Sequence, residues 1–148
     1  MSLDDLSDIA TVVIALCTGY GLYFAKLQIK NSREAQREAT AKSIFQDYIK
    51  ACVSYPKLAK PNFTEIKANP VLLKEYECFR TLVLNACEEI HLLFPNDNYW
   101  THALYSHLTL HKDSLSDNFN SDSYSKAFQK LVNDVVTGNK AILKNDWR

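Results

Sequence analysis

The sequence predicts an all-α protein in which an N-terminal transmembrane helix continues into a stalk and is followed by a small helical bundle. Three observations predict this fold class. The run 9–25 is uncharged and largely apolar, apolar residues further along recur at steps of three and four, and strand-like alternation never persists. At 148 residues the chain has room for one anchor and one domain with a modest core.

The segment 9–25 is expected to cross a membrane. A transmembrane helix needs roughly 20 apolar residues, with a lower limit near 17, and Lys26 can extend its ammonium back to water and lengthen the effective span. The acidic tail 1–8 is unlike a secretory signal, which begins with positive charge. A helix of a soluble core would carry a polar face, which 9–25 lacks. A potassium-channel filter at 18–21 would need a second membrane span, and no second apolar run follows.

Charge on either side of this segment predicts an orientation. Three aspartates precede it and all 17 basic residues follow it. Basic residues near the end of a span stay on the cytoplasmic side, so we expect a single-pass protein of the inner (plasma) membrane with its N-terminus outside. The four cysteines form no CxxC pair, which favours reduced thiols and agrees with a cytoplasmic domain.

Small residues recur every four positions within the predicted span. Such spacing lets transmembrane helices approach closely, so we expect the lipid bilayer as one partner and a homo-oligomer through this face. The small residues lie in two rows, Ala15 with Gly19, and Cys17 with Gly21 and Ala25.

The helix is expected to continue beyond the membrane as a stalk over 26–54. No glycine or proline occurs from Leu22 to Val53, and the composition favours helix. Apolar residues recur at three and four in the second half of the stalk, which is therefore expected to pack on the bundle domain, 55–148.

Turn and capping signals divide that domain. Prolines bound a short linker over 55–62, and Asn62 with Glu65 predicts the cap of a brief helix. Asn69 followed by Pro70 predicts the start of a helix running to about Phe94. Its predicted core seam is Tyr76, Phe79, Val83, Ala86, Ile90 and Leu93.

Two further helices complete the predicted bundle. One runs from Tyr99 to about Leu115, with Trp100, Ala103, Leu104 and Leu108 on one stripe. After a polar loop, 116–122, the last helix buries Ala127, Phe128, Leu131, Val132, Val135 and Val136. Gly138 ends this helix or marks a break before 141–143.

His107 and His111 have the spacing by which two imidazoles on one helix can hold a metal ion. A metal-dependent hydrolase using this pair is one function to weigh. The competing interpretation is that both histidines border the apolar stripe as semi-polar residues, since the metalloprotease motif has Glu where Leu108 follows here.

No other motif indicates catalysis or a cofactor. The 17 basic and 17 acidic residues balance, which disfavours a binder of duplex nucleic acid. Three glycines cannot build a phosphate-binding loop, and the acidic loop after Leu115 lacks the glycine and glutamate of a calcium site. We therefore expect a non-enzymatic protein.

Basic residues around the proline linker are candidates for an anionic ligand. In a symmetric assembly, copies of one cation gather at the axis and concentrate positive charge. The alternative is that they are ordinary surface charges. The set consists of Lys57, Lys60, Lys67, Lys74 and Arg80.

In layout, the run 9–25 followed by the basic and acidic stretch 26–42 resembles small bacterial single-span membrane proteins, some of which act in phage defence. Among those are membrane effectors of type III CRISPR systems, which are triggered by cyclic oligoadenylate. The resemblance implies a cyclic oligonucleotide as a signalling ligand and an effect on the membrane. The alternative is a passive scaffold or subunit of a membrane complex.

Overall fold

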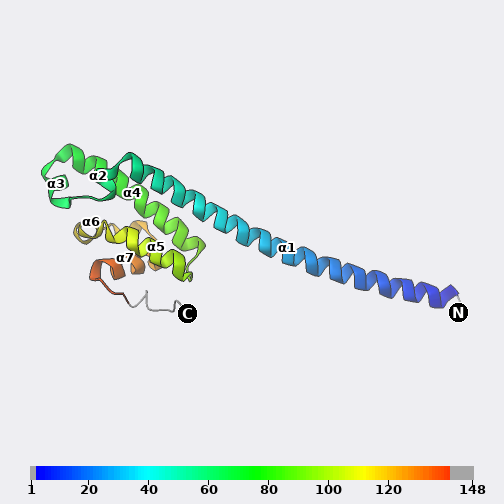
Figure 1. The fold of residues 1–148 in the computed structure, drawn as a ribbon. Helices are drawn as coiled ribbons and strands as arrows, with labels where there is room; N and C mark the ends of the chain where they lie inside the picture. Colours follow the sequence, from blue (N-terminus) through cyan, green and yellow to red (C-terminus); the bar gives the residue numbers. More distant parts are fainter. Residues whose placement is uncertain (1–2, 141–148) are drawn as a thin grey trace. The chain divides into compact units, whose positions relative to one another are not determined.

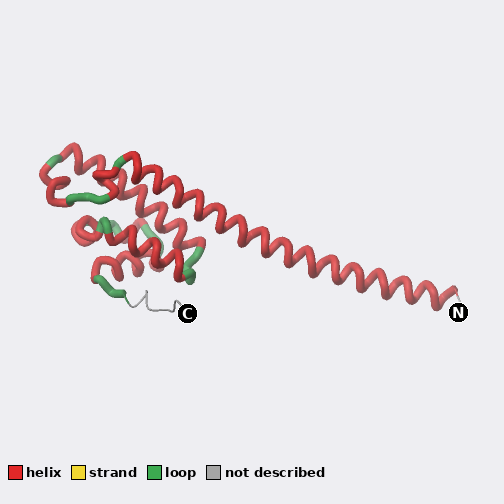
Figure 2. The backbone as a smooth tube through the Cα atoms, in the orientation of Figure 1, coloured by secondary structure: helices red, strands yellow, loops and turns green. Residues whose placement is uncertain are grey.

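The computed structural model describes residues 3–140, and for residues 3–10 and 12 it describes the backbone alone. Within 3–140 the chain is all-helical and contains no strand, as predicted (Figures 1 and 2). The chain divides into two compact units, Met1–Thr40 and Ala41–Arg148.

Helix α1 spans Leu3–Ser54, 52 residues, and is continuous from its first residue to its last (Figure 2). The predicted continuity of the segment 9–25 with the stalk 26–54 is therefore confirmed. The acidic residues assigned to a tail before the span are also helical, because α1 already begins at Leu3. The long run without proline explains why no break occurs.

Within the residues that the structure describes, no helix combines the length and the apolarity needed to cross a membrane. Of the predicted span, the side chains of Ile9, Ala10 and Val12 lie outside those described.

In the second unit the end of α1 is followed by two brief helices and one long one. Helix α2 is Pro56–Ala59, α3 is Phe63–Ala68 and α4 is Pro70–Leu93. The Asn62 side-chain oxygen accepts a hydrogen bond from the Glu65 amide, and that of Asn69 accepts from the amides of Val71 and Leu72 at 3.0 and 3.2 Å. Both predicted caps are confirmed.

The prediction of a single helix from Tyr99 to about Leu115 is wrong. The chain forms α5 over Asn98–Thr109 and, after a break, α6 over Lys112–Asp117. At the break the amides of Leu110 and His111 bond to the carbonyls three residues earlier, at 3.2 and 3.0 Å. This tightening ends α5 and leaves His111 only 2% exposed.

The polar loop is shorter than expected, because α6 continues to Asp117 and a turn of 3-10 helix, η1, covers Ser121–Ser123. Helix α7 spans Lys126–Thr137 and starts at the Ser125 cap. Gly138 ends it with φ of 73°, as one predicted alternative had it. The other, a break before 141–143, lies outside the described residues.

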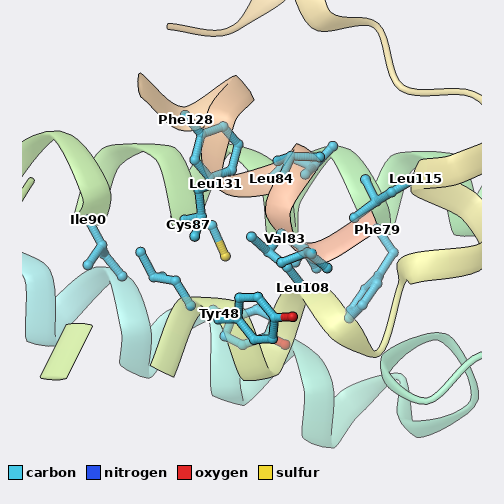
Figure 3. Packing of buried hydrophobic residues seen from close by; sticks show 14 of the residues in the cluster. Tyr48, Phe79, Val83, Leu84, Cys87, Ile90, Leu108, Leu115, Phe128 and Leu131 are labelled. Carbon is cyan, nitrogen blue, oxygen red and sulfur yellow. The ribbon is translucent and has the colours of Figure 1, made fainter. Parts of the chain in front are cut away.

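The core of the second unit is formed around α4, which packs against α3, α5 and α7. Figure 3 shows side chains of α4 beside Leu108 of α5 and Phe128 of α7. The predicted α4 seam is confirmed, with Ala86 and Leu93 partly buried and its other members buried. Tyr48 near the end of α1 belongs to the same cluster. The most deeply buried apolar residues of α5 and α7 are Leu104, Leu108, Phe128, Leu131, Val132 and Val135.

Candidate functional site

Large apolar side chains stand exposed on α1 in the first unit. At 3.6 residues per turn, six of these nine side chains lie within an arc of about 100°, and Ile14, Leu22 and Ile29 lie on the opposite side of the helix. Leu16 is 64% and Leu22 68% exposed, which is unusual for leucine. We call this set the apolar girdle: Val13, Ile14, Leu16, Tyr20, Leu22, Tyr23, Phe24, Leu27 and Ile29.

The hydroxyl of Thr18, which lies among the girdle residues, bonds within the helix itself. The Thr18 hydroxyl donates to the Ile14 carbonyl at 2.8 Å, so this side chain needs no outside partner. Tyr20 and Phe24 pack ring against ring at 6.0 Å. The surface of the girdle is therefore mainly apolar, with few groups that form hydrogen bonds to their surroundings.

The predicted small-residue rows lie among these apolar side chains. A Cβ built at Gly19 or Gly21 would meet no atom within 4 Å, so both positions are open to a neighbouring helix. Their role in helix association stays a prediction. Beyond the girdle the surface becomes charged, and Lys30 faces Glu34 across one turn at 3.9 Å.

A polar cavity of about 280 Å³ lies in the second unit, between α4 and the segment that joins α6 to α7. We call it the Arg80 pocket. Its walls combine one guanidinium, several amides and hydroxyls, and two aromatic rings. The lining residues are Arg80, Thr81, Leu84 and Asn85 from α4, with Asn118, Phe119, Asn120, Ser123 and Tyr124.

Arg80 is held at this pocket by α6. Its Nη1 donates to the Ser114 hydroxyl at 2.7 Å and lies 3.4 Å from the Ser114 carbonyl oxygen. Ser114 is 1% exposed, so the anchor point is rigidly packed. The buried Nε of Arg80 has no hydrogen-bond partner. Among the described side chains no carboxylate lies within ion-pair distance of this guanidinium.

The loop wall of the pocket is fixed by side chains from α4 and α7. The Glu88 carboxylate accepts a hydrogen bond from the Ser125 amide at 2.6 Å. The Gln129 side-chain amide donates to the carbonyls of Ser121 and Tyr124 at 2.7 and 2.8 Å. Burial and the nearby Glu88 raise the pKa of Tyr124, against the opposing effect of Arg80.

The five basic residues grouped from the sequence do not share one site within the second unit. Lys67 forms an ion pair with Asp117 at 2.9 Å and lies over the Phe63 ring at 4.8 Å. The remaining three, Lys57, Lys60 and Lys74, are exposed and line neither cavity described for this unit. Of the five, Arg80 alone lines one of the two cavities described.

The two histidines weighed as metal ligands bond to different tyrosines. His107 Nδ1 lies 3.0 Å from the Tyr48 hydroxyl, and His111 Nδ1 lies 2.9 Å from the Tyr76 hydroxyl. Among the described residues no group of three His, Cys, Asp or Glu side chains is placed to hold a metal ion. Burial lowers the pKa of both histidines, that of His111 to about 4.

A second, mostly apolar cavity of about 450 Å³ lies between α4 and the end of α1 with the residues that follow it. Its walls include Tyr55, Phe79 and Leu82, with Glu75 and the exposed thiol of Cys78 at its edge. Sequence patterns indicated neither this cavity nor the loop residues of the Arg80 pocket. Both arise where segments far apart in the chain meet.

In comparisons with known proteins, no protein family, no curated protein and no solved structure matches the chain.

Proposed function

We propose that this protein is a non-enzymatic, single-pass membrane protein. Helix α1 anchors it through the segment 9–25, and the helical bundle lies on the cytoplasmic side, where it senses a ligand or partner. The observation that carries the proposal is the apolar girdle, which exposes large side chains around α1 while the second unit buries its own core.

Contact of the girdle with water is unfavourable. Fully burying one large apolar side chain is worth about 1.5–3 kcal/mol. For the nine girdle side chains, which are 43–69% exposed, removal from water is worth on the order of 10 kcal/mol. Contiguous apolar surfaces of this kind mark sites that membranes or proteins cover.

A bilayer suits the girdle better than a single partner helix. A coiled-coil partner covers one stripe, which would leave Ile14, Leu22 and Ile29 on the opposite side of α1 in water, whereas a bilayer covers both sides. The 17 residues from Ile9 to Ala25 rise about 26 Å as a helix, slightly less than a hydrocarbon core of about 30 Å. Lys26 extending its ammonium towards water, together with slight bilayer thinning, accommodates the difference.

Charge then sets the orientation. The aspartates before the segment and the lysines and arginines after it favour an outer N-terminus and a cytoplasmic bundle. Self-association through the small-residue rows would bring bundles together at the membrane surface. A sensor of a signalling ligand and a subunit of a larger complex both fit this arrangement, and we favour the sensor because the bundle contains the Arg80 pocket.

Flotation with lipid vesicles tests the anchor. The full chain is reconstituted without detergent and centrifuged through a density gradient. We expect the natural protein to float with the vesicles, and Leu16→Arg to shift at least half of it to the bottom fraction. An arginine near the helix centre costs about 3 kcal/mol in membrane insertion.

Val53→Arg is the matched control, because Val53 is also an exposed apolar residue of α1, 76% exposed, but lies outside the girdle. It should float like the natural protein. If the natural protein stays at the bottom of the gradient, or if both variants float equally well, the proposed anchor is wrong.

A further inference from the structure

We propose that the Arg80 pocket binds a small organic monocarboxylate with a flat ring. This deepens the sensing role proposed above by naming a site and a ligand class. The pocket lies within the second unit, and none of its lining residues belongs to the apolar girdle.

The charge at the pocket argues for an anion. Arg80 is half-buried, lacks a carboxylate partner among the described residues, and is fixed through Nη1 by Ser114. Nη1 is held by Ser114 and Nε is closed off from solvent, so Nη2 is the guanidinium nitrogen left for a ligand. A carboxylate oxygen can accept a charge-assisted hydrogen bond from it.

The number of cations argues for a single negative charge. Among residues 3–140, Arg80 is the one basic residue in the pocket lining, and no lysine joins it there. A phosphate dianion or an oligonucleotide would leave charge unmatched. The volume of about 280 Å³ lies below the roughly 300–1,000 Å³ of pockets for drug-sized ligands. A cyclic oligonucleotide is therefore too large for this site in one copy of the chain.

The walls argue for a flat body. Phe119 and Tyr124 lie stacked, with ring centroids 5.5 Å apart and an interplanar angle of 19°. Leu84, 5% exposed, adds apolar surface from α4. Aromatic and apolar walls favour a ring, which gains contact area at little cost in conformational entropy.

Amides at the rim suit a polar substituent on that ring. The side chains of Asn85 and Asn118 are exposed and make no hydrogen bond to another described residue, whereas Asn120 donates to the Ser123 hydroxyl at 3.0 Å. A ring hydroxyl or amine can bond to the two unengaged amides.

The pocket is largely formed before a ligand arrives. Glu88 and Gln129 hold the loop wall through the three hydrogen bonds described above, and Ser114 holds Arg80. A site whose walls are already fixed loses little freedom when it binds, so a small ligand can be retained.

The test uses the full chain in detergent micelles and isothermal titration calorimetry. The probes are benzoate, 4-hydroxybenzoate, the neutral 4-hydroxybenzamide and inorganic phosphate. We expect saturable binding of 4-hydroxybenzoate, and at least tenfold weaker binding of the benzamide and of phosphate. Failure of both carboxylates to saturate overturns the proposal, and equal binding of the benzamide or tighter binding of phosphate overturns the carboxylate assignment.

Three variants locate the binding. Arg80→Gln should weaken it at least tenfold by removing the cation. Asn85→Asp should do the same by placing a negative charge at an exposed rim position, where the fold is not at risk. Lys74→Gln removes an exposed cation of α4 outside the pocket and should bind normally. Normal binding by Asn85→Asp, or equal losses in Asn85→Asp and Lys74→Gln, would place binding elsewhere.

The flotation variant separates this site from the anchor. Leu16→Arg should bind 4-hydroxybenzoate in micelles with unchanged affinity, even though it fails to float with vesicles. Loss of carboxylate binding in that variant would contradict a site confined to the second unit, whereas loss of flotation alone bears only on the anchor.

Discussion

The Tyr76 hydroxyl and His111 Nδ1 lie 2.9 Å apart in the interior of the second unit, joining residues 35 positions apart in the chain. The bond ties α4 to the junction between α5 and α6. The other ring nitrogen of His111, Nε2, is buried without a partner. Burial disfavours the charged imidazolium, so the imidazole of His111 stays neutral.

Acid should therefore destabilise the bundle. Burial, with contributions from His107 and Arg80, lowers the pKa of His111 from 6.5 to about 4. Because the unfolded chain takes up a proton more readily, the stability from this group is complete above pH 6.5 and is lost as the pH falls from 6.5 to 4. The loss amounts to about 3 kcal/mol. Urea unfolding followed by circular dichroism between pH 4 and 7 measures it.

His111→Gln separates this group from the others that titrate. The variant should be less stable at pH 7 and show a shallower dependence of unfolding free energy on pH between 4 and 6.5. The pKa values of His91 and His107 are also lowered by burial, so some dependence should remain. An unchanged slope in His111→Gln would mean that His111 is not the group responsible.

Removing the Tyr76 hydroxyl should destabilise the second unit more than removing the Tyr48 hydroxyl. Tyr76→Phe leaves a ring nitrogen of fully buried His111 without its partner, which costs about 1–3 kcal/mol. Tyr48→Phe leaves His107, which is only partly buried, so its ring can bond to water instead. Urea unfolding at pH 7 compares the two variants, and an equal or reversed order of stability would contradict this difference in burial.

Gly138→Ala should lower the unfolding free energy by about 1 kcal/mol. The residue has φ of 73°, and a Cβ disfavours this left-handed conformation. Gly138→Asn is the matched variant and should cost less, because asparagine tolerates the conformation better. Thermal or urea unfolding measures both. If alanine is tolerated as well as asparagine, the strain at this cap is not the reason for the glycine.

Gly21→Leu should weaken self-association of the protein in vesicles. A leucine on the small-residue row prevents close approach of two helices, although nothing within the chain opposes it. Energy transfer between labelled copies should fall at least twofold, while Leu22→Ile, outside the row, should leave it unchanged. Equal transfer in Gly21→Leu and the natural protein would exclude association through this row.

Local signals predicted much of the fold correctly. The Asn69 and Pro70 pair fixed the start of α4, and the spacing of Tyr76, Val83 and Ile90 identified its buried face. The break between α5 and α6 escaped prediction because Leu110 and His111 include neither glycine nor proline. There the burial of His111 against Tyr76 accompanies the end of the helix, and that contact depends on a residue far away in the chain.

The Arg80 pocket was predictable only in part. Arg80 stood out by its charge, but the sequence grouped it with four lysines that lie outside the pocket. Its actual neighbours, Phe119 and Tyr124, belong to a segment whose path has no periodicity to predict it. Lys67 was equally unpredictable, since its partner Asp117 lies 50 positions further along the chain.

Labelling of two cysteines tests the membrane anchor most directly. Cys17 in the predicted span and Cys78 on α4 are both exposed in the structure, so water-soluble maleimide should reach both if the helix is in water. In vesicles with the bundle outside, we expect Cys78 to react and Cys17 to stay unmodified, because lipid excludes the water-soluble reagent. Modification of Cys17 at the rate of Cys78 would contradict a membrane-embedded α1.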